Sequence, residues 1–112
     1  MEILQIQIQA ILPILISRQM VSIEFLTLEL LSRTTKMEPF GALKEILAQI
    51  KREAKEMADR FQRSFVLLRK TKLESRSLSL ALVVQSLKAQ VQLQQKQQLL
   101  QQIRNALPAV ND

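Results

Sequence analysis

The sequence predicts an all-α fold: a three-helix bundle built on a long helical hairpin, with an apolar N-terminal helix. One glycine in 112 residues disfavours sheets joined by tight turns, and 47% hydrophobic residues disfavours disorder. Apolar residues also recur at three- and four-residue spacing along most of the chain, which is helical periodicity. The length suits a single helical domain, residues 1–112.

The N-terminal leader is the most ambiguous segment. Isoleucine alternates with glutamine over residues 5–9, a strand-like pattern, but nothing after residue 35 predicts a strand that could pair with it. We therefore expect the first helix at residues 14–33, with Pro13 in its first turn, where a missing N–H is not needed. Residues 1–13 are then either a preceding helical segment or an extended arm that docks elsewhere.

The leader matches neither a secretory signal nor a membrane span. It begins with Glu2 and reaches its first cation only at Arg18, whereas a signal peptide starts with positive charge. The uncharged run, residues 3–17, has 15 residues, and a spanning helix needs about 20. We expect no transmembrane segment and a cytoplasmic location.

Residues 14–33 carry apolar side chains on more than one side of the predicted helix. One stripe contains Ile14, Val21, Phe25 and Leu28, and the other contains Ile16, Met20, Ile23, Leu30 and Leu31. Such a helix fills a groove between two others and still has apolar surface left over. The predicted protein interface, for larger protein subunits or for self-association, is Ile14, Val21, Phe25, Leu28 and Leu31. The alternative is a compact monomer that buries both stripes.

Two long helices, residues 40–70 and 78–107, form the predicted hairpin. Thr35, Glu38 and Pro39 have the spacing of a helix N-terminus, a polar serine-rich stretch at 71–77 predicts the turn, and Pro108 ends the last helix. The stripe of the first hairpin helix is Leu43, Leu47, Ile50, Ala54, Met57, Phe61, Phe65 and Leu68. The predicted seam of the second is Leu80, Val84, Leu87 and Val91, shifting to Leu93, Leu100, Ile103 and Leu107. Nine glutamines between 85 and 102 predict a solvated face or, alternatively, an aggregation-prone tract.

The residues available for chemistry predict a protein that is not an enzyme. Histidine, cysteine and tyrosine are absent, and the single glycine cannot form a phosphate-binding loop. Glu56 and Asp59 lie one turn apart, but each has an arginine four residues on, Arg60 and Arg63, so ordinary surface ion pairs explain them. We predict no catalytic residue, no metal site, no cofactor and no small-molecule substrate.

Positive charge is concentrated in the middle of the chain. Residues 32–76 hold twelve Lys or Arg against six acids, within a net charge of +6 for the whole chain. A line of cations along one helix (Lys44, Lys51, Lys55, Arg69) and a cluster near the turn (Arg60, Arg63, Arg69, Lys70, Lys72, Arg76) are candidates for contact with an RNA or single-stranded DNA backbone. A membrane surface, an acidic protein or solvent alone could also face these residues.

In its small size, basic charge and all-helical character, the chain resembles the small subunits of CRISPR effector complexes. That resemblance implies a role lining nucleic acid beside larger subunits. The chain is also similar to short helical secretion chaperones, which implies that the apolar first helix shields a hydrophobic segment of a partner. Both resemblances rest on composition and architecture. The leading interpretation is a non-enzymatic small basic helical subunit of a larger assembly that acts by helix packing with protein partners.

Overall fold

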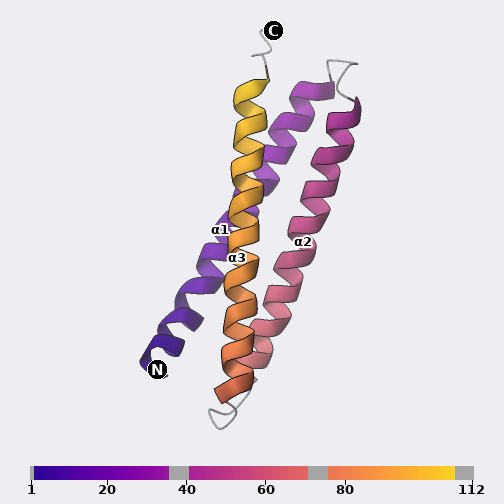
Figure 1. Ribbon diagram of the computed structural model, residues 1–112. Coiled ribbons are helices and arrows are strands. Elements are labelled where there is room, and N and C mark those ends of the chain that lie inside the picture. Colours follow the sequence, from indigo (N-terminus) through magenta and orange to yellow (C-terminus); the bar gives the residue numbers. More distant parts are fainter. Residues whose placement is uncertain (1, 36–40, 71–75, 108–112) are drawn as a thin grey trace.

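The computed structural model describes residues 2–35, 41–70 and 76–107, and these residues form three helices and no strand. They are α1 (Glu2–Thr35), α2 (Gly41–Lys70) and α3 (Arg76–Ala106). Each helix packs against the other two, so the predicted all-α three-helix bundle is confirmed (Figure 1). The bundle is elongated, with extents of 59 × 20 × 15 Å. Helices α1 and α3 run in the same direction and α2 runs in the opposite one (Figure 1).

Helix α1 is longer than the sequence suggested. Residues 2–12 are helical, as one of the two predicted alternatives has it, and form neither a strand nor an extended arm. They continue the same helix, so the predicted helix start at residue 14 is wrong. Pro13 therefore lies inside the helix and withholds the hydrogen bond that the carbonyl of Gln9 would accept. Burial offsets this loss, because Ile8 and Leu12 on one side of the proline and Ile16 on the other all pack against the core.

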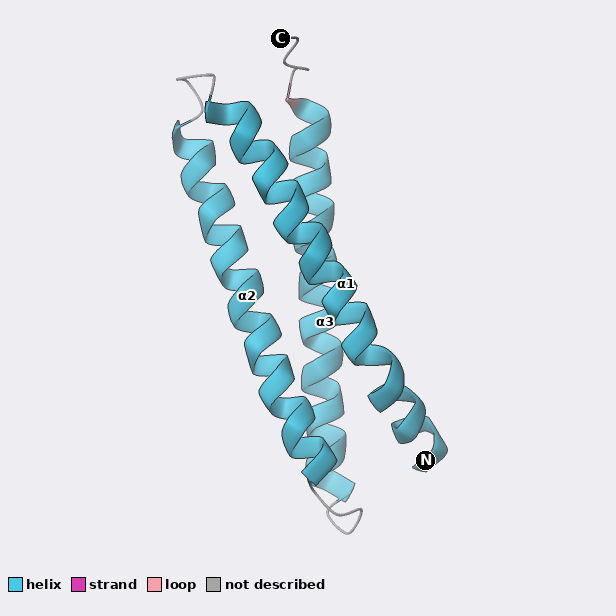
Figure 2. Cartoon of the chain, turned by 180° about the vertical axis from the view of Figure 1, so that it is seen from behind, coloured by secondary structure: helices cyan, strands magenta, loops and turns pink. Residues whose placement is uncertain are grey.

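The N-terminal end of α1 stands apart from the neighbouring ends of α2 and α3 (Figures 1 and 2). The other two helices begin and end within two residues of the predicted ranges. Thr35 is the last residue of α1. Of the turn predicted at 71–77, residues 76 and 77 belong to α3. Glu38, Pro39, residues 71–75 and Pro108 lie outside the described residues.

The stripe predicted for α2 is the side of that helix that faces the core. Its buried members are Leu47, Ile50, Ala54, Phe61, Phe65 and Leu68. Leu43 and Met57 are partly buried against them. The rings of Phe61 and Phe65 stack with their centroids 5.7 Å apart. The 3–4 spacing places these side chains on one face, and α1 and α3 cover it.

The first half of α3 faces the core with a different stripe from the predicted one. Leu80, Val84, Leu87 and Val91 are exposed, and the buried positions are Leu82, Val83, Ser86, Gln90 and Leu93. The predicted seam is therefore wrong up to residue 91, and correct for Leu93 and Leu100, which are fully buried. The buried stripe includes a serine and a glutamine, so the larger apolar side chains on the opposite face gave the stronger pattern.

Buried hydroxyl groups in the helices bond to their own backbone. Thr27 Oγ1 donates to the carbonyl of Ile23 at 2.9 Å, and Ser86 Oγ donates to that of Leu82 at 2.8 Å. This internal bonding satisfies a hydroxyl without a partner from another helix. The side-chain oxygens of Gln19 and Gln90 are buried and accept no hydrogen bond from the described residues.

Candidate functional site: the outer faces of α1 and α3

An apolar stripe runs along the side of α1 that points away from the core. We call it the outer face of α1, and it consists of Ile11, Ile14, Arg18, Val21, Phe25 and Leu28. Its apolar members are all more than half exposed, up to 63% for Val21 and 64% for Phe25. Residues of this size are normally buried when a helix packs inside a domain. The face is therefore unpartnered within the described chain.

The inner and outer faces of α1 are interleaved in sequence. Ile16, Ile23 and Leu30, spaced seven residues apart, are buried. Two residues before each of them lie Ile14, Val21 and Leu28, which are exposed. A two-residue step turns about 200° around a helix, so the two series occupy opposite sides. Four of the five predicted interface residues therefore lie on the outer face, whereas Leu31 is half-buried against the core.

A second exposed apolar stripe lies on α3. The outer stripe of α3 consists of Leu80, Val84, Leu87 and Val91. Part of it lines a shallow depression of about 450 Å³ formed by Val84, Leu87, Lys88, Val91, Gln92 and Gln95. The sequence did not predict this surface, because its residues had been assigned to the core. Ser86 and Gln90 lie in helical register with Leu93. This less apolar stripe is the sequence pattern that could have shown which side of α3 faces the core and which side is exposed.

Polar contacts join α1 to α3 at two levels along the bundle axis. Gln97 Nε2 donates to Ser22 Oγ at 2.8 Å. The Arg104 guanidinium lies 3.3 Å from Glu29 Oε1, which also accepts a 3.0 Å bond from Arg33. The two interhelical contacts both join residues that are 75 positions apart. Because the helices run in the same direction, this constant offset defines which residues of α1 and α3 lie side by side.

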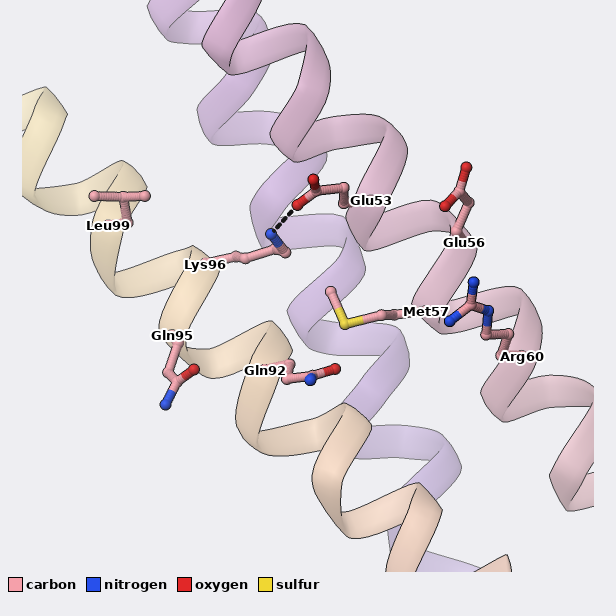
Figure 3. A pocket seen from close by; sticks show the side chains of 8 residues that line it. All are labelled: Glu53, Glu56, Met57, Arg60, Gln92, Gln95, Lys96 and Leu99. Atoms are coloured by element: carbon pink, nitrogen blue, oxygen red, sulfur yellow. Dashed lines mark hydrogen bonds and ion pairs between the residues drawn. The ribbon is translucent and has the colours of Figure 1, made fainter.

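A groove of about 450 Å³ lies between α2 and α3 (Figure 3). It is lined by Glu53, Glu56, Met57, Arg60, Gln92, Gln95, Lys96 and Leu99. Lys96 Nζ lies 2.6 Å from Glu53 Oε2 and joins the two helices. Gln49 Nε2 also donates to Glu53 Oε1 at 3.0 Å. The hydrogen bond from Lys96, followed by that from Gln49, holds the pKa of Glu53 below its ordinary value.

The charges in this groove are balanced and partly used by the fold. Glu53 and Lys96 neutralise each other, and Glu56 lies beside Arg60 on the α2 rim (Figure 3). Over the part of the chain that the structure describes, no three His, Cys, Asp or Glu side chains gather to hold a metal ion. The groove therefore lies between two helices that the Glu53–Lys96 ion pair joins. Its lining contains both charged and apolar side chains.

The predicted nucleic-acid contacts lie on more than one side of α2. Lys51, Lys55, Arg60, Arg63 and Lys70 are exposed, and Lys44 is half-buried. The side chains of Arg69 and Arg76, and all of Lys72, lie outside what the structure describes. Lys55 and Arg60 are separated by about 140° around the helix. The line of lysines and the arginine cluster therefore do not share one face.

Helix α1 is long and apolar enough to cross a membrane on length and composition alone. The 25 residues Ala10–Thr34 have a mean hydropathy of 1.5, and 28% of the window is buried inside the bundle. Core helices and signal sequences meet the same criteria. In this fold the inner face of the helix lies against α2 and α3.

No protein-family model, curated protein or solved structure matches this chain. The fold and the surface define its class: a three-helix bundle with unpartnered apolar faces on its two parallel helices. Function is accordingly argued from these surfaces.

Proposed function

We propose that this chain is a non-enzymatic small helical subunit that acts by packing the outer face of α1 against a protein partner. The observation that carries the proposal is that the five large apolar residues of the outer face, from Ile11 to Leu28, are each more than half exposed. Their span is about 26 Å of helix. Completing the burial of such half-exposed side chains contributes roughly 1–2 kcal/mol each, which favours association over exposure to water.

The spacing of the outer face indicates what kind of surface it fits. Its members are separated alternately by three and four residues, which is the pattern of the a and d positions of a coiled coil. A partner helix buries such a stripe along its whole length. In the chaperone-like version of this proposal, that helix is a hydrophobic segment of a client protein, and the same residues bind it.

Site-specific photo-cross-linking tests the proposal. A benzophenone side chain in place of Phe25 should cross-link to a protein when the chain is irradiated in its native cells. The same group in place of Glu45, an exposed residue of α2, is the matched control and should give little product. The product's mass identifies the partner as a second copy or a different chain. If position 25 captures no more protein than position 45, the outer face is not a protein interface.

Contact with a nucleic-acid backbone is a second candidate function, favoured by the free cations of α2. Lys51, Lys55 and Arg63 are exposed and form no ion pair among the described residues. Each phosphate neutralised by such a group releases counterions, so binding should be independent of base sequence and should weaken steeply with salt.

A triple variant tests this second function. Replacing Lys51, Lys55 and Arg63 by Gln keeps helix propensity, so the helical circular dichroism should be unchanged. Binding to a single-stranded probe at about 50 mM salt should weaken. The slope of log affinity against log salt concentration should become shallower by about two to three units. Lys88→Gln on α3 controls for loss of a cation elsewhere. Equal binding by the wild type and the triple variant would mean that these cations only face solvent.

A further inference from the structure

We infer that the partner of the outer face of α1 is a helix of a different protein, which carries an Asp or Glu opposite Arg18 within an apolar stripe of its own. This inference rests on the proposed function and names the chemistry of its partner. It follows from the position of Arg18 in the face and from the distribution of acidic residues in this chain.

Arg18 occupies a central position in an otherwise apolar face. It is exposed, and two apolar members of the face precede it and three follow it. Along the helix axis, Ile11 lies about 10 Å and Leu28 about 15 Å from Arg18. A partner helix that covers both ends of the face therefore passes over Arg18.

Arg18 has no acidic neighbour on its own helix face. The residues three and four positions away are Ile14, Leu15, Val21 and Ser22. The nearest acid in the sequence is Glu24, which is six residues away and turned by about 120° around the helix. Helix α3 contains no Asp or Glu. Arg18 accordingly forms no ion pair among the described residues.

A carboxylate on the partner resolves the cost of covering this charge. An unpaired guanidinium that is covered by apolar side chains loses its hydration, which opposes association. An Asp or Glu opposite Arg18 replaces the lost water with two parallel hydrogen bonds, and the planar guanidinium fits this geometry. The methylene groups of the arginine pack along the apolar residues beside it. Arg18 thus favours a partner helix with an acid at this position over one that is apolar or basic there.

The same charge disfavours a second copy of this chain as the partner. Parallel packing of two outer faces places Arg18 opposite Arg18 of the second copy. Antiparallel packing centred on the face brings Arg18 as close to Arg18 of the second copy as to Glu24 of the second copy, about 4.5 Å along the axis in both cases. Like charges in the middle of the contact oppose association in either orientation. The net charge of +6 also favours an acidic partner over a second copy.

Substitution of Arg18 tests the inference through the sign of its effect. The photo-cross-link from position 25 reports the association. Arg18→Met makes the face wholly apolar, yet it should lower the yield of cross-linked product about tenfold, because the carboxylate of the partner is then covered without a counter-charge. Arg18→Lys keeps the charge and should retain more product than Arg18→Met. An equal or higher yield with Arg18→Met would show that no carboxylate faces Arg18 and would overturn the inference.

Two controls accompany these variants. Lys55→Met removes another exposed cation that forms no ion pair among the described residues, on α2, and it should leave the yield unchanged. Because Arg18 is exposed, its variants should keep the helical circular dichroism of the wild type.

The sequence of the captured segment is an independent readout. Phe25 lies seven residues from Arg18, so the partner residue captured at position 25 should lie about seven residues from an Asp or Glu, on a helix with apolar residues at three- and four-residue spacing. Peptide mass spectrometry of the product identifies this segment. A segment without an acid near that position, or a product with twice the mass of this chain, would overturn the inference.

Lipid phosphate is another anion that would pair with Arg18, and α1 is long and apolar enough to meet a membrane. Vesicles of phosphatidylcholine and phosphatidylserine test this alternative. Flotation of the purified wild-type chain with these vesicles, lost in Arg18→Glu and kept in Lys55→Glu, would show that the outer face meets a lipid surface and would overturn the inference. We expect no flotation that depends on Arg18.

The two proposals can fail separately. If position 25 captures a protein and the yield does not fall with Arg18→Met, the inference about the partner's acid is wrong and the proposed function stands. If position 25 captures no more protein than position 45, both are wrong.

Discussion

Glu53 is the residue whose electrostatics the fold changes most clearly. Its carboxylate accepts hydrogen bonds from Lys96 on α3 and Gln49 on α2, and its pKa is lowered. A carboxyl group with a lowered pKa in the folded state stabilises the fold while it is ionised. That contribution is complete above the ordinary glutamate pKa of 4.5 and is lost as the pH falls through the lower folded value.

We therefore predict that Glu53→Gln reduces the dependence of stability on acidic pH. The urea midpoint of the wild type should fall more steeply than that of the variant as the pH is lowered from about 5 to 3. Glu45→Gln, which removes an exposed carboxylate on the same helix, is the control and should keep the wild-type slope. Parallel profiles for wild type and Glu53→Gln would show that the contact with Lys96 adds no stability, as is common for exposed ion pairs.

Among the elements, α2 was predictable because its pattern has one interpretation. Most of its apolar residues form a single stripe, although Ile46, Val66 and Leu67 are exposed outside it. The continuous stripe therefore marks the one face that enters the core. Phe61, Phe65 and Leu68 are buried as their spacing predicted. The existence of three helices followed from the same periodicity and from the scarcity of glycine.

Helices α1 and α3 were less predictable because each has two apolar faces. Periodicity shows that two stripes exist, but it does not show which one the other helices cover. In α3 the covered stripe includes Ser86 and Gln90, so size and hydrophobicity favoured the wrong face. In α1, Pro13 resembled a helix start, and only tertiary packing on both sides of it reveals a continuous helix.

The candidate site could be predicted in part. The outer stripe of Ile14, Val21, Phe25 and Leu28 was recognisable as surplus apolar surface, and the structure leaves it exposed. Ile11 extends it beyond Pro13, into the segment for which the sequence left a helix and an extended arm as alternatives. The outer stripe of α3 was missed because recognising it requires knowing how α3 is rotated in the bundle.

At the scale of the whole molecule, the residues that hold the bundle together and the exposed apolar residues lie on different faces of the helices. The core lies along one side of each helix, and most of the exposed large apolar side chains lie on α1 and α3, with Ile46, Val66 and Leu67 exposed on α2. The exposed cations of α2 lie on the remaining helix. A protein partner on the outer face of α1 leaves these cations free for an anionic partner, so the two proposed contacts are compatible.

The central claim is that α1 folds with its inner face and binds with its outer face. The most direct test compares Leu30→Asp with Leu28→Asp, the same substitution two residues apart, at side chains that are 0% and 58% exposed. Burying an unpaired carboxylate costs several kcal/mol, so Leu30→Asp should abolish cooperative thermal unfolding measured by circular dichroism. Leu28→Asp should keep its helicity and change the unfolding free energy, measured at dilution where the chain is monomeric, by less than about 1 kcal/mol. It should also lose association with the protein partner, measured by photo-cross-linking from position 25. Unfolding by Leu28→Asp, or full association despite it, would contradict the division of α1 into two faces.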